Sequence, residues 1–527
     1  MALPLKKRAS SPKYVSPTQT VLVGFESPFS QKLDPDNRWI SLAHRIPWDK
    51  IVGQYNKQMS GSSEGRPPLS GRIAIGAIFI KHINNWDDRE TILQIQENMY
   101  LQYFLGFDSF STAPVFDASL FVEIRKRMTD TVLNAINEEV VRSYLAPAPP
   151  LKTINQGETQ PSELPSKDSS PISSEATAPA VTHWGRMITD ATACPQDIAF
   201  PTDLNLLSEA REKTELYIDM LFANMGNSEL KKPRTYRQKA RKDYLNVAKN
   251  KNKSKKTIRK AVGKQLRYLR RNLKNVHLLL DGYQLQQRPF PLAHSTQRYL
   301  WIIHTLYEQQ HKMHSTFTHS VEHRIVSLHQ PHVRPIPRGK TNAKIEFGAK
   351  IEVSLVNGFA FLDELSWDAF HEGNHLMSYI DNYKRRFGYY PKEVLADGIF
   401  SSRENRKKLK ELGIKLLAKP LGRPSKTAVK EYIRPGERNP IEGKFGQGKT
   451  AYGLGCIKAR LKTTSQSWIA SIILVLNLVK LAGLNLYCLC FAEIKYCIEI
   501  VTSILKSKTY ERLNILSRPL KSQFLAL

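Results

Sequence analysis

The sequence predicts an α/β protein in which a helical N-terminal domain precedes the α/β core and a basic helical insertion interrupts it. Apolar residues recur at helical spacing in the first 145 residues. Further along, short apolar runs alternate with helical patterns, which is typical of strands and helices packed in layers. Between Lys231 and Lys274 there are nineteen Lys or Arg residues and one acid, Asp243. These three observations predict the fold class.

We expect five parts along the 527 residues. They are a helical N-terminal domain (1–145), a disordered linker (146–182), an α/β core (183–199 and 344–465), a basic helical insertion (200–343) and C-terminal helices (466–527). The linker is rich in Pro, Ser, Thr and Ala and has almost no large apolar residues, so it cannot bury enough surface to become ordered.

Helical periodicity marks the N-terminal domain. Ile73, Ala77 and Ile80 share one helical face, and Asp87 or Asp88 is placed to cap the next helix. A further helix is expected from the spacing of Leu120, Ile124, Met128, Val132 and Ile136.

The core begins with a short strand, 186–190, which we expect to end at Asp190. Asn357-Gly358 lies between alternating apolar residues and predicts the turn of a hairpin over 350–362. A helix is expected from about Trp367 to its stop at Gly388.

Three more elements complete the core: a strand over 394–397, a helix capped by Ser401 with Glu404, and a strand over 414–418. A final helix carries Glu442. This order, with acids after the first and fourth strands and one on the last helix, predicts a ribonuclease-H-like fold. The insertion after Asp190 departs from that pattern.

Charge indicates the partner. The chain has 78 Lys and Arg residues against 48 Asp and Glu residues, a formal net charge of +30, which favours a polyanion such as nucleic acid. Within the insertion, apolar residues from Ile258 to Leu273 define one helix face, and cations crowd the others. We expect phosphate contacts there rather than a merely solvated face. The expected contact residues are Lys255, Lys256, Arg259, Lys260, Arg267, Arg270 and Arg271.

The cysteines and the apolar segments indicate a cytoplasmic protein. Five cysteines in so long a chain do not form a disulfide framework, and the N-terminus shows no signal peptide. The stretch 468–492 is the one membrane candidate, but Asn477, Lys480 and Asn485 interrupt it. We expect a buried helix there and no membrane.

Three carboxylates, those of Asp190, Asp397 and Glu442, are candidate metal ligands. Hard divalent cations prefer carboxylate oxygens, and two such ions about 4 Å apart can promote in-line displacement at phosphorus. Singly, each acid could instead cap a helix or a loop. Asp197 and Asp203 compete with Asp190 as the first ligand.

The spacing of Arg438, Glu442 and Lys449 matches a known signature: Arg, three residues, Glu, six residues, Lys. Together with the segments 188–192, 395–400 and 458–461, it makes most of residues 30–480 resemble a bacterial insertion-sequence transposase of the DDE type, in the insertion-sequence-five-like group. One departure is Pro435, which stands where the family often has Tyr; Tyr432 is a possible substitute.

The resemblance implies a reaction, a cofactor and partners. It implies cleavage at transposon ends by metal-activated water, followed by attack of the freed 3′-hydroxyl on target DNA. Mg²⁺ or Mn²⁺ would be held by Asp190, Asp397 and Glu442, and Arg438 and Lys449 would hold phosphates nearby. Double-stranded DNA, self-association on DNA and a nucleoid-associated cytoplasmic location are further implications.

Three alternatives remain open. One is a decayed copy that binds DNA without cleaving it. Another is a nucleotidase, because 443–450 satisfies the phosphate-loop pattern, although no buried strand precedes it. The third is a zinc site among the histidines from His304 to His332, for which structural or DNA-facing roles are the simpler interpretation.

Overall fold

The computed structural model describes residues 32–59, 69–145, 183–225, 231–337, 345–418 and 436–483. Two compact units divide the chain: Met1–Ala118 with Val475–Leu527, and Ser119–Leu474. The predicted linker and the position of Tyr432 lie outside the described residues, so those two predictions stay as they were.

The described part of the first unit is helical. Its helices are α1 (Arg38–Arg45), α2 (Trp48–Asn56), α3 (Gly71–Asn84), α4 (Asp88–Glu97) and α5 (Met99–Leu105). α3 is apolar on nearly all sides and is buried on nearly all sides. At Gly76 a Cβ atom would lie 2.6 Å from the side chain of Leu105, so a larger residue there would force Leu105 to shift. Asp87 caps α4 by accepting from the Glu90 amide, as predicted.

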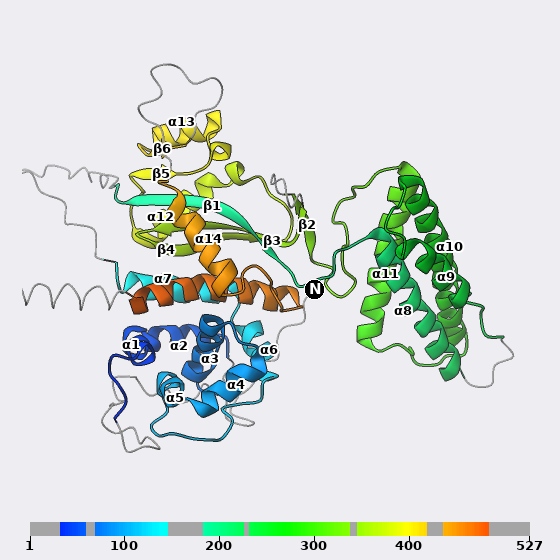
Figure 1. The fold of residues 1–527 in the computed structure, drawn as a ribbon, viewed down its shortest axis with the longest axis horizontal. Helices are drawn as coiled ribbons and strands as arrows, with labels where there is room; N and C mark the ends of the chain where they lie inside the picture. The colour runs from blue at the N-terminus through cyan, green and yellow to red at the C-terminus, as the bar shows by residue number, and fades with distance from the viewer. Residues whose placement is uncertain are drawn as a thin grey trace, which may run out of the picture. The chain divides into compact units, whose positions relative to one another are not determined.

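A six-stranded mixed sheet forms the centre of the second unit (Figure 1). Its strands are β1 (Arg186–Pro195), β2 (Arg334–Pro337), β3 (Ile345–Val356), β4 (Phe359–Ser366), β5 (Glu393–Leu395) and β6 (Lys415–Leu417). The order is β2-β3-β1-β5-β6, and β4 also pairs with β3. β1 runs antiparallel to β3 and parallel to β5, which is parallel to β6.

The predicted hairpin is confirmed. β3 and β4 pair antiparallel, and Asn357 and Gly358 between them have φ values of 51° and 77°. Positive φ at both positions is what a two-residue hairpin turn requires. β2 was not predicted. It contains Pro335 and Pro337, which cannot donate backbone hydrogen bonds, so it can form only an edge strand, and it pairs with the start of β3.

Helices and short turns connect and flank these strands. They are α6 (Leu120–Arg127), α7 (Asp130–Arg142), η3 (Glu372–Asn374), α12 (Leu376–Phe387), η4 (Gly398–Phe400), α13 (Arg403–Glu411) and α14 (Asn439–Ala451). Three local predictions were wrong in detail. The helix expected from Leu120 to Ile136 is two helices, because Thr129 caps a new one. α12 begins at Leu376 rather than near Trp367, and Ser402 rather than Ser401 caps α13.

Four helices, α8 (Asp203–Asn224), α9 (Arg237–Ala248), α10 (Lys255–Leu285) and α11 (His294–Thr316), form a bundle between β1 and β2 in the sequence (Figure 1). Leu207, Leu269, Val276 and Ile303 are among its fully buried core residues. The predicted packing face of α10 is confirmed from Val262 to Leu273, whereas Ile258 is 39% exposed.

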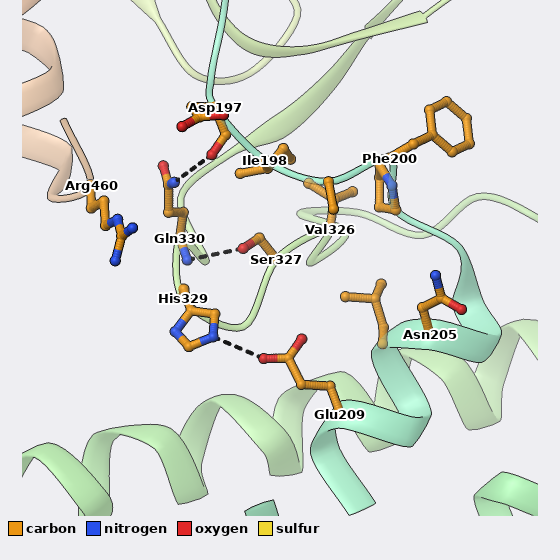
Figure 2. Close-up of a pocket in the computed structure, with 13 residues that line it drawn as sticks. Asp197, Ile198, Phe200, Asn205, Glu209, Val326, Ser327, His329, Gln330 and Arg460 are labelled. Atoms are coloured by element: carbon orange, nitrogen blue, oxygen red, sulfur yellow. Dashed lines mark hydrogen bonds and ion pairs between the residues drawn. The ribbon is translucent and has the colours of Figure 1, made fainter. Parts of the chain in front are cut away.

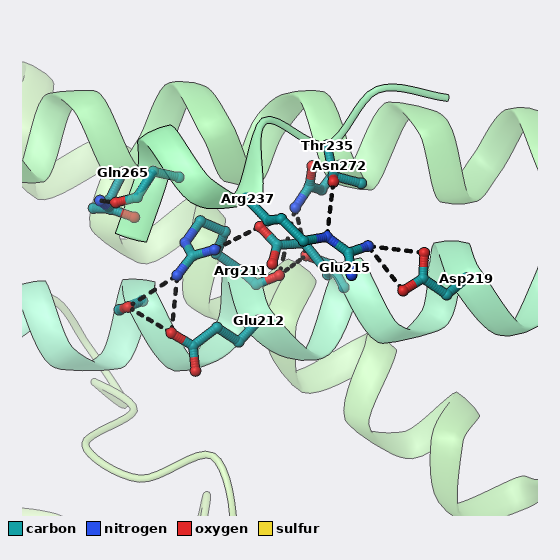
Figure 3. A network of polar contacts seen from close by, with 11 residues as sticks. Arg211, Glu212, Glu215, Asp219, Thr235, Arg237, Gln265 and Asn272 are labelled. Atoms are coloured by element: carbon teal, nitrogen blue, oxygen red, sulfur yellow. Dashed lines mark hydrogen bonds and ion pairs between the residues drawn. The ribbon is translucent and has the colours of Figure 1, made fainter. Parts of the chain in front are cut away.

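Ion pairs hold this cationic bundle together (Figure 3). Arg211, buried in α8, pairs with Glu215 and with Glu212. Arg237, at the start of α9, pairs with Asp219 of α8 at 2.8 Å. The amide of Asn272 donates to Thr214 Oγ1 and so ties α10 to α8. Glu212, Glu215 and Asp219 are therefore used in ion pairs within the bundle.

One helix in the described part of the chain, Lys462–Gly483, is long and apolar enough to cross a membrane, judged by length and composition. However, 72% of its most apolar window is buried within the protein. The helix predicted near Trp468 is therefore present and mostly buried, while the expected absence of a membrane remains a prediction.

Glu352 of β3 is an acid buried in the sheet. It is 0% exposed, Thr189 Oγ1 donates to its Oε1 at 2.6 Å, and no described residue pairs with its Oε2. Burial raises its pKa well above the ordinary value of 4.5. The folded chain therefore binds this proton more tightly than the unfolded chain, and the resulting stability is lost as pH rises above about 4.5 toward the folded pKa.

We expect Glu352→Gln, which copies the protonated acid, to raise the free energy of unfolding at pH 8 by about 1 kcal/mol or more and to have little effect at pH 4. Urea unfolding at the two pH values measures this. Glu411→Gln, at an exposed acid of α13, is the matched control. An equal gain at both pH values would show that Glu352 is not the source of the pH dependence.

Candidate active site

Two aspartates lie at equivalent positions relative to the parallel strands β1 and β5: Asp190 within β1, and Asp397 two residues past the end of β5. Ile188 of β1 is in register with Leu395 of β5, and two residues further along each chain come Asp190 and Asp397. The backbone of Asp397 is still extended (φ −72°, ψ 165°), so the period-two alternation of side chains continues past the end of β5 and points both carboxylates to the same face of the sheet. The prediction that these acids come together is therefore supported by the strand register.

Asp190 is not at the end of its strand, contrary to expectation. β1 continues to Pro195 because β3 pairs with it along nearly its whole length. β5 ends at Leu395, so β1 has its parallel neighbour only as far as Ile188. Asp190 therefore stands where one side of β1 becomes open, and Asp397 begins η4 beside it.

Backbone amides orient both carboxylates. The Ala191 amide donates to Asp190 Oδ1 at 2.9 Å, and the Gly398 amide donates to Asp397 Oδ1 at 2.7 Å. The two environments differ in depth, since the side chain of Asp190 is 18% exposed and that of Asp397 is 61% exposed.

Arg438 joins the two aspartates. Its Nη2 lies 2.9 Å from Asp190 Oδ2, and its Nη1 lies 3.4 Å from Asp397 Oδ1. The residue is the N-cap of α14, which packs against β1. One cation therefore sits between two carboxylates that would otherwise repel each other.

Burial raises the pKa of Asp190 to about 6, although the guanidinium of Arg438 opposes the shift. The negative charges of Glu372 and Asp397 raise this pKa further. A partly buried acid that favours neutralisation has a strong tendency to bind a cation. The two aspartates thus fit a hard divalent cation, because such ions bind carboxylate oxygens. In the metal-free protein the guanidinium of Arg438 occupies the position between them.

The third predicted ligand, Glu442, is one helical turn beyond Arg438. Helix geometry places Glu442 and Lys449 within about 40° of Arg438 around the α14 axis, at about 6 Å and 16 Å along it. Glu442 is exposed, and Ile441 and Phe445 beside it are buried. No described residues form a group of three potential ligands already placed to hold a metal. The structure therefore brings Asp190 and Asp397 together through Arg438, whereas Glu442 lies one turn further along α14 and completes no such group with them.

Glu372 is a further acid near this site that sequence reasoning missed. It lies in η3, pairs with Lys350 Nζ at 2.7 Å, and its charge acts on Asp190. The sequence around Glu372 has no motif or periodicity, because η3 is a short 3-10 helix of three residues.

Three of the competing interpretations find no support among the described residues. Residues 443–450 lie inside α14 and form no phosphate-binding loop. Asp203 is bound by Arg324 and Gln310 within the insertion. His304 faces His277 with 2.7 Å between their Nε2 atoms, but no third potential metal ligand completes a group among the described residues.

A separate pocket of about 320 Å³ contains Asp197 and Arg460 (Figure 2). His329 lies between two partners there: its Nε2 is 3.0 Å from Glu209, and its Nδ1 is 2.8 Å from the Tyr299 hydroxyl. Gln330 donates to the main-chain oxygen of Asp197. The competing candidate Asp197 lines this pocket, whereas Asp190, Asp397 and Glu442 do not.

The predicted DNA-contact residues divide into two groups. Lys256, Lys260, Arg267 and Arg270 are exposed on the face of α10 opposite its buried residues, along about 21 Å of helix. We call these four residues the basic stripe. Lys255 is exposed at its margin, at the first turn of α10.

Arg259 and Arg271 have partners within the protein. Arg259 donates to the His314 carbonyl at 2.6 Å and lies over the ring of Phe317, so its main contacts are structural. Arg271 is exposed and stacks on Tyr236. Neighbouring α9 adds exposed cations beyond the predicted set, Arg241, Lys242 and Lys249, around a shallow pocket.

Comparisons with known proteins give three findings. Residues 27–127 match a family described as a transposase domain, and residues 394–479 match a family described as a transposase DDE domain. The chain is 27% identical over 181 residues, 34% of its length, to an uncharacterized protein, ORF8 in the nfe locus of Rhizobium meliloti, and covers 71% of that protein. No solved structure matches. Asp397, Arg438, Glu442 and Lys449 fall within the second matched region, and the resemblance predicted from the sequence is confirmed at the level of the two domains.

Proposed function

From two transposase domains in one chain, which indicate a DNA transposase, we propose that this protein cleaves the ends of an insertion sequence and joins them to target DNA. The observation that carries this proposal is that Asp190 of β1 and Asp397, just past the end of the parallel strand β5, lie close enough to share the guanidinium of Arg438. The insertion-sequence-five-like group is the most specific assignment we propose.

We propose that the core is ribonuclease-H-like. Its support is the topology: β4, β3, β1, β5 and β6 lie in that order, with β3 the strand antiparallel to β1. Such a core carries its acids where β1 and β5 lie together and on the following helix, as Asp190, Asp397 and Glu442 do here.

In this proposal, Asp190, Asp397 and Glu442 hold Mg²⁺, or Mn²⁺ in its place. When bound, such a cation supplies Lewis-acid stabilisation of the charge that develops on phosphate oxygens during in-line displacement. The protein contributes carboxylates that strand and backbone contacts hold in position before DNA arrives. Glu442 approaches from α14, the element that also carries Arg438.

Cationic residues would position the DNA. Arg438 and Lys449 lie on one flank of α14 and are expected to contact phosphates near the reacting bond. The basic stripe, with Lys255, Arg259 and Arg271, would neutralise phosphates further along double-stranded DNA. Self-association on DNA and a nucleoid-associated cytoplasmic location complete the proposal.

The direct test is Mg²⁺-dependent cleavage of a labelled duplex that carries the DNA flanking this gene. We expect the native protein to cleave it and Glu442→Gln to lose most of that cleavage, because the amide cannot replace an anionic metal ligand. Glu437→Gln, five residues earlier and just before α14, is the control for a neighbouring lost charge. Tight binding without cleavage by the native protein would instead identify a decayed copy.

A further inference from the structure

Arg438 forms an ion pair with each of two predicted metal ligands, Asp190 and Asp397. Its two terminal nitrogens contact different aspartates, at 2.9 Å to Asp190 and 3.4 Å to Asp397. A divalent cation bound by the same two carboxylates would need the same space and the same oxygens. The guanidinium and the metal therefore compete for one location.

The contact has the features of an exchangeable ion pair rather than of a permanent one. The Nε of Arg438 is buried and has no hydrogen-bond partner among the described residues. A buried ion pair that is fully built satisfies such donors, because leaving one unpaired is costly. The longer contact is to Asp397, the more exposed aspartate, so the guanidinium is held less tightly on the side open to solvent.

We propose that Arg438 is a positioning residue that acts as the internal counter-ion of the metal-free site and leaves both aspartates when a divalent cation binds. The inference rests on the proposed function, since it assumes that Asp190 and Asp397 bind the cation. In the metal-free protein, Arg438 relieves the repulsion between the carboxylates and keeps them in place. After the exchange, its guanidinium is free to contact a DNA phosphate.

The exchange links metal binding to the state of α14. Arg438 is the N-cap of this helix, and Glu442 is on its first turn. The guanidinium that leaves the aspartates and the third carboxylate, that of Glu442, therefore belong to the same helix, α14. Coupling of this kind is reciprocal, so removing the competitor must raise metal affinity.

Mn²⁺ binding without DNA tests the proposal independently of catalysis. Free Mn²⁺ is measured from its electron paramagnetic resonance signal during titration of the native protein, Arg438→Gln and Arg438→Lys. We expect Arg438→Gln to bind Mn²⁺ more tightly by on the order of tenfold, within the range usual for coupled sites. Lys is a single point donor that cannot reproduce the bidentate fork, so Arg438→Lys should fall between the two.

Arg186→Gln is the matched control. Arg186 is also next to the start of α14, but it pairs with Glu393 at 3.1 Å and with Glu437 at 4.0 Å rather than with the aspartates. Arg186→Gln removes the same charge as Arg438→Gln but leaves the contacts of the two aspartates unchanged. The Mn²⁺ affinity of this variant should therefore stay near that of the native protein. An equal gain in Arg186→Gln and Arg438→Gln would reduce the effect to net charge and overturn the proposal.

Other outcomes separate this inference from the proposed function. Unchanged or weaker Mn²⁺ binding in Arg438→Gln, with its fold verified by circular dichroism, would overturn the exchange. Loss of Mn²⁺ binding in Asp397→Asn would in that case still support the metal site. If Arg438→Gln does not fold, Arg438→Lys decides between the two results. Mn²⁺ binding that is the same in the native protein and in Asp397→Asn would count against the proposed function itself.

Discussion

Asp397→Asn should lower DNA strand cleavage about a hundredfold or more and leave DNA affinity nearly unchanged. The substitution removes one of the two carboxylates that Arg438 bridges, and a lost metal ligand costs several kcal/mol of transition-state stabilisation. Affinity should persist because the basic stripe is on α10 and is untouched. Single-turnover cleavage with Mg²⁺ and a filter-binding isotherm on the same duplex measure the two quantities.

Asp381→Asn is the control for this result. Asp381 is an exposed acid of α12, so its loss changes the net charge equally without touching the site. If cleavage and binding fall together in Asp397→Asn, the residue has a structural or DNA-contact role, and the assignment of the metal site is wrong.

Replacing the basic stripe, Lys256, Lys260, Arg267 and Arg270, with Gln should weaken DNA binding most strongly at low salt. Each phosphate contact contributes about 0.9 to the slope of log affinity against log salt, so losing four should reduce that slope by about three to four. The four side chains are exposed and point away from the packed face of α10, so the bundle should keep its stability. Fluorescence anisotropy over a range of NaCl concentrations gives the slope directly.

A quadruple variant with the same charge change separates local contact from net charge. Arg403, Lys407, Lys410 and Lys415 are exposed cations of α13 and β6 and serve this purpose. An unchanged salt slope in the stripe variant would show that the stripe is only a solvated face. A similar loss in both variants would indicate attraction by the whole charge of the chain rather than by α10.

The exclusion of a phosphate loop shows how context overrides a motif. Residues 443–450 satisfy the letters of that pattern, yet Pro440 starts a helix and the glycines at 443 and 446 sit within it. A phosphate loop requires a preceding strand and an open backbone. Because residues 443–450 are helical, Arg438, Glu442 and Lys449 lie along one flank of α14. This arrangement agrees with the transposase signature rather than with a phosphate loop.

Local signals in the sequence determined the elements that depend on near neighbours. Asn357-Gly358 specified the hairpin turn because both residues accept positive φ, and Asp87 specified the start of α4 because its side chain reaches the Glu90 amide. The packed face of α10 followed from the period of its apolar residues, and the charge of the insertion from composition alone.

Only the tertiary structure decided how distant segments meet. The long pairing of β1 with β3 carries β1 past Asp190, and the register with β5 sets that residue beside Asp397, 207 positions later. The same packing brings Arg438 between the aspartates and Glu372 near them. No local pattern encodes these contacts, because strand pairing and burial are set by chain segments far apart in the sequence. The sequence thus determined which residues could perform the chemistry, and the sheet decided which of them face one another.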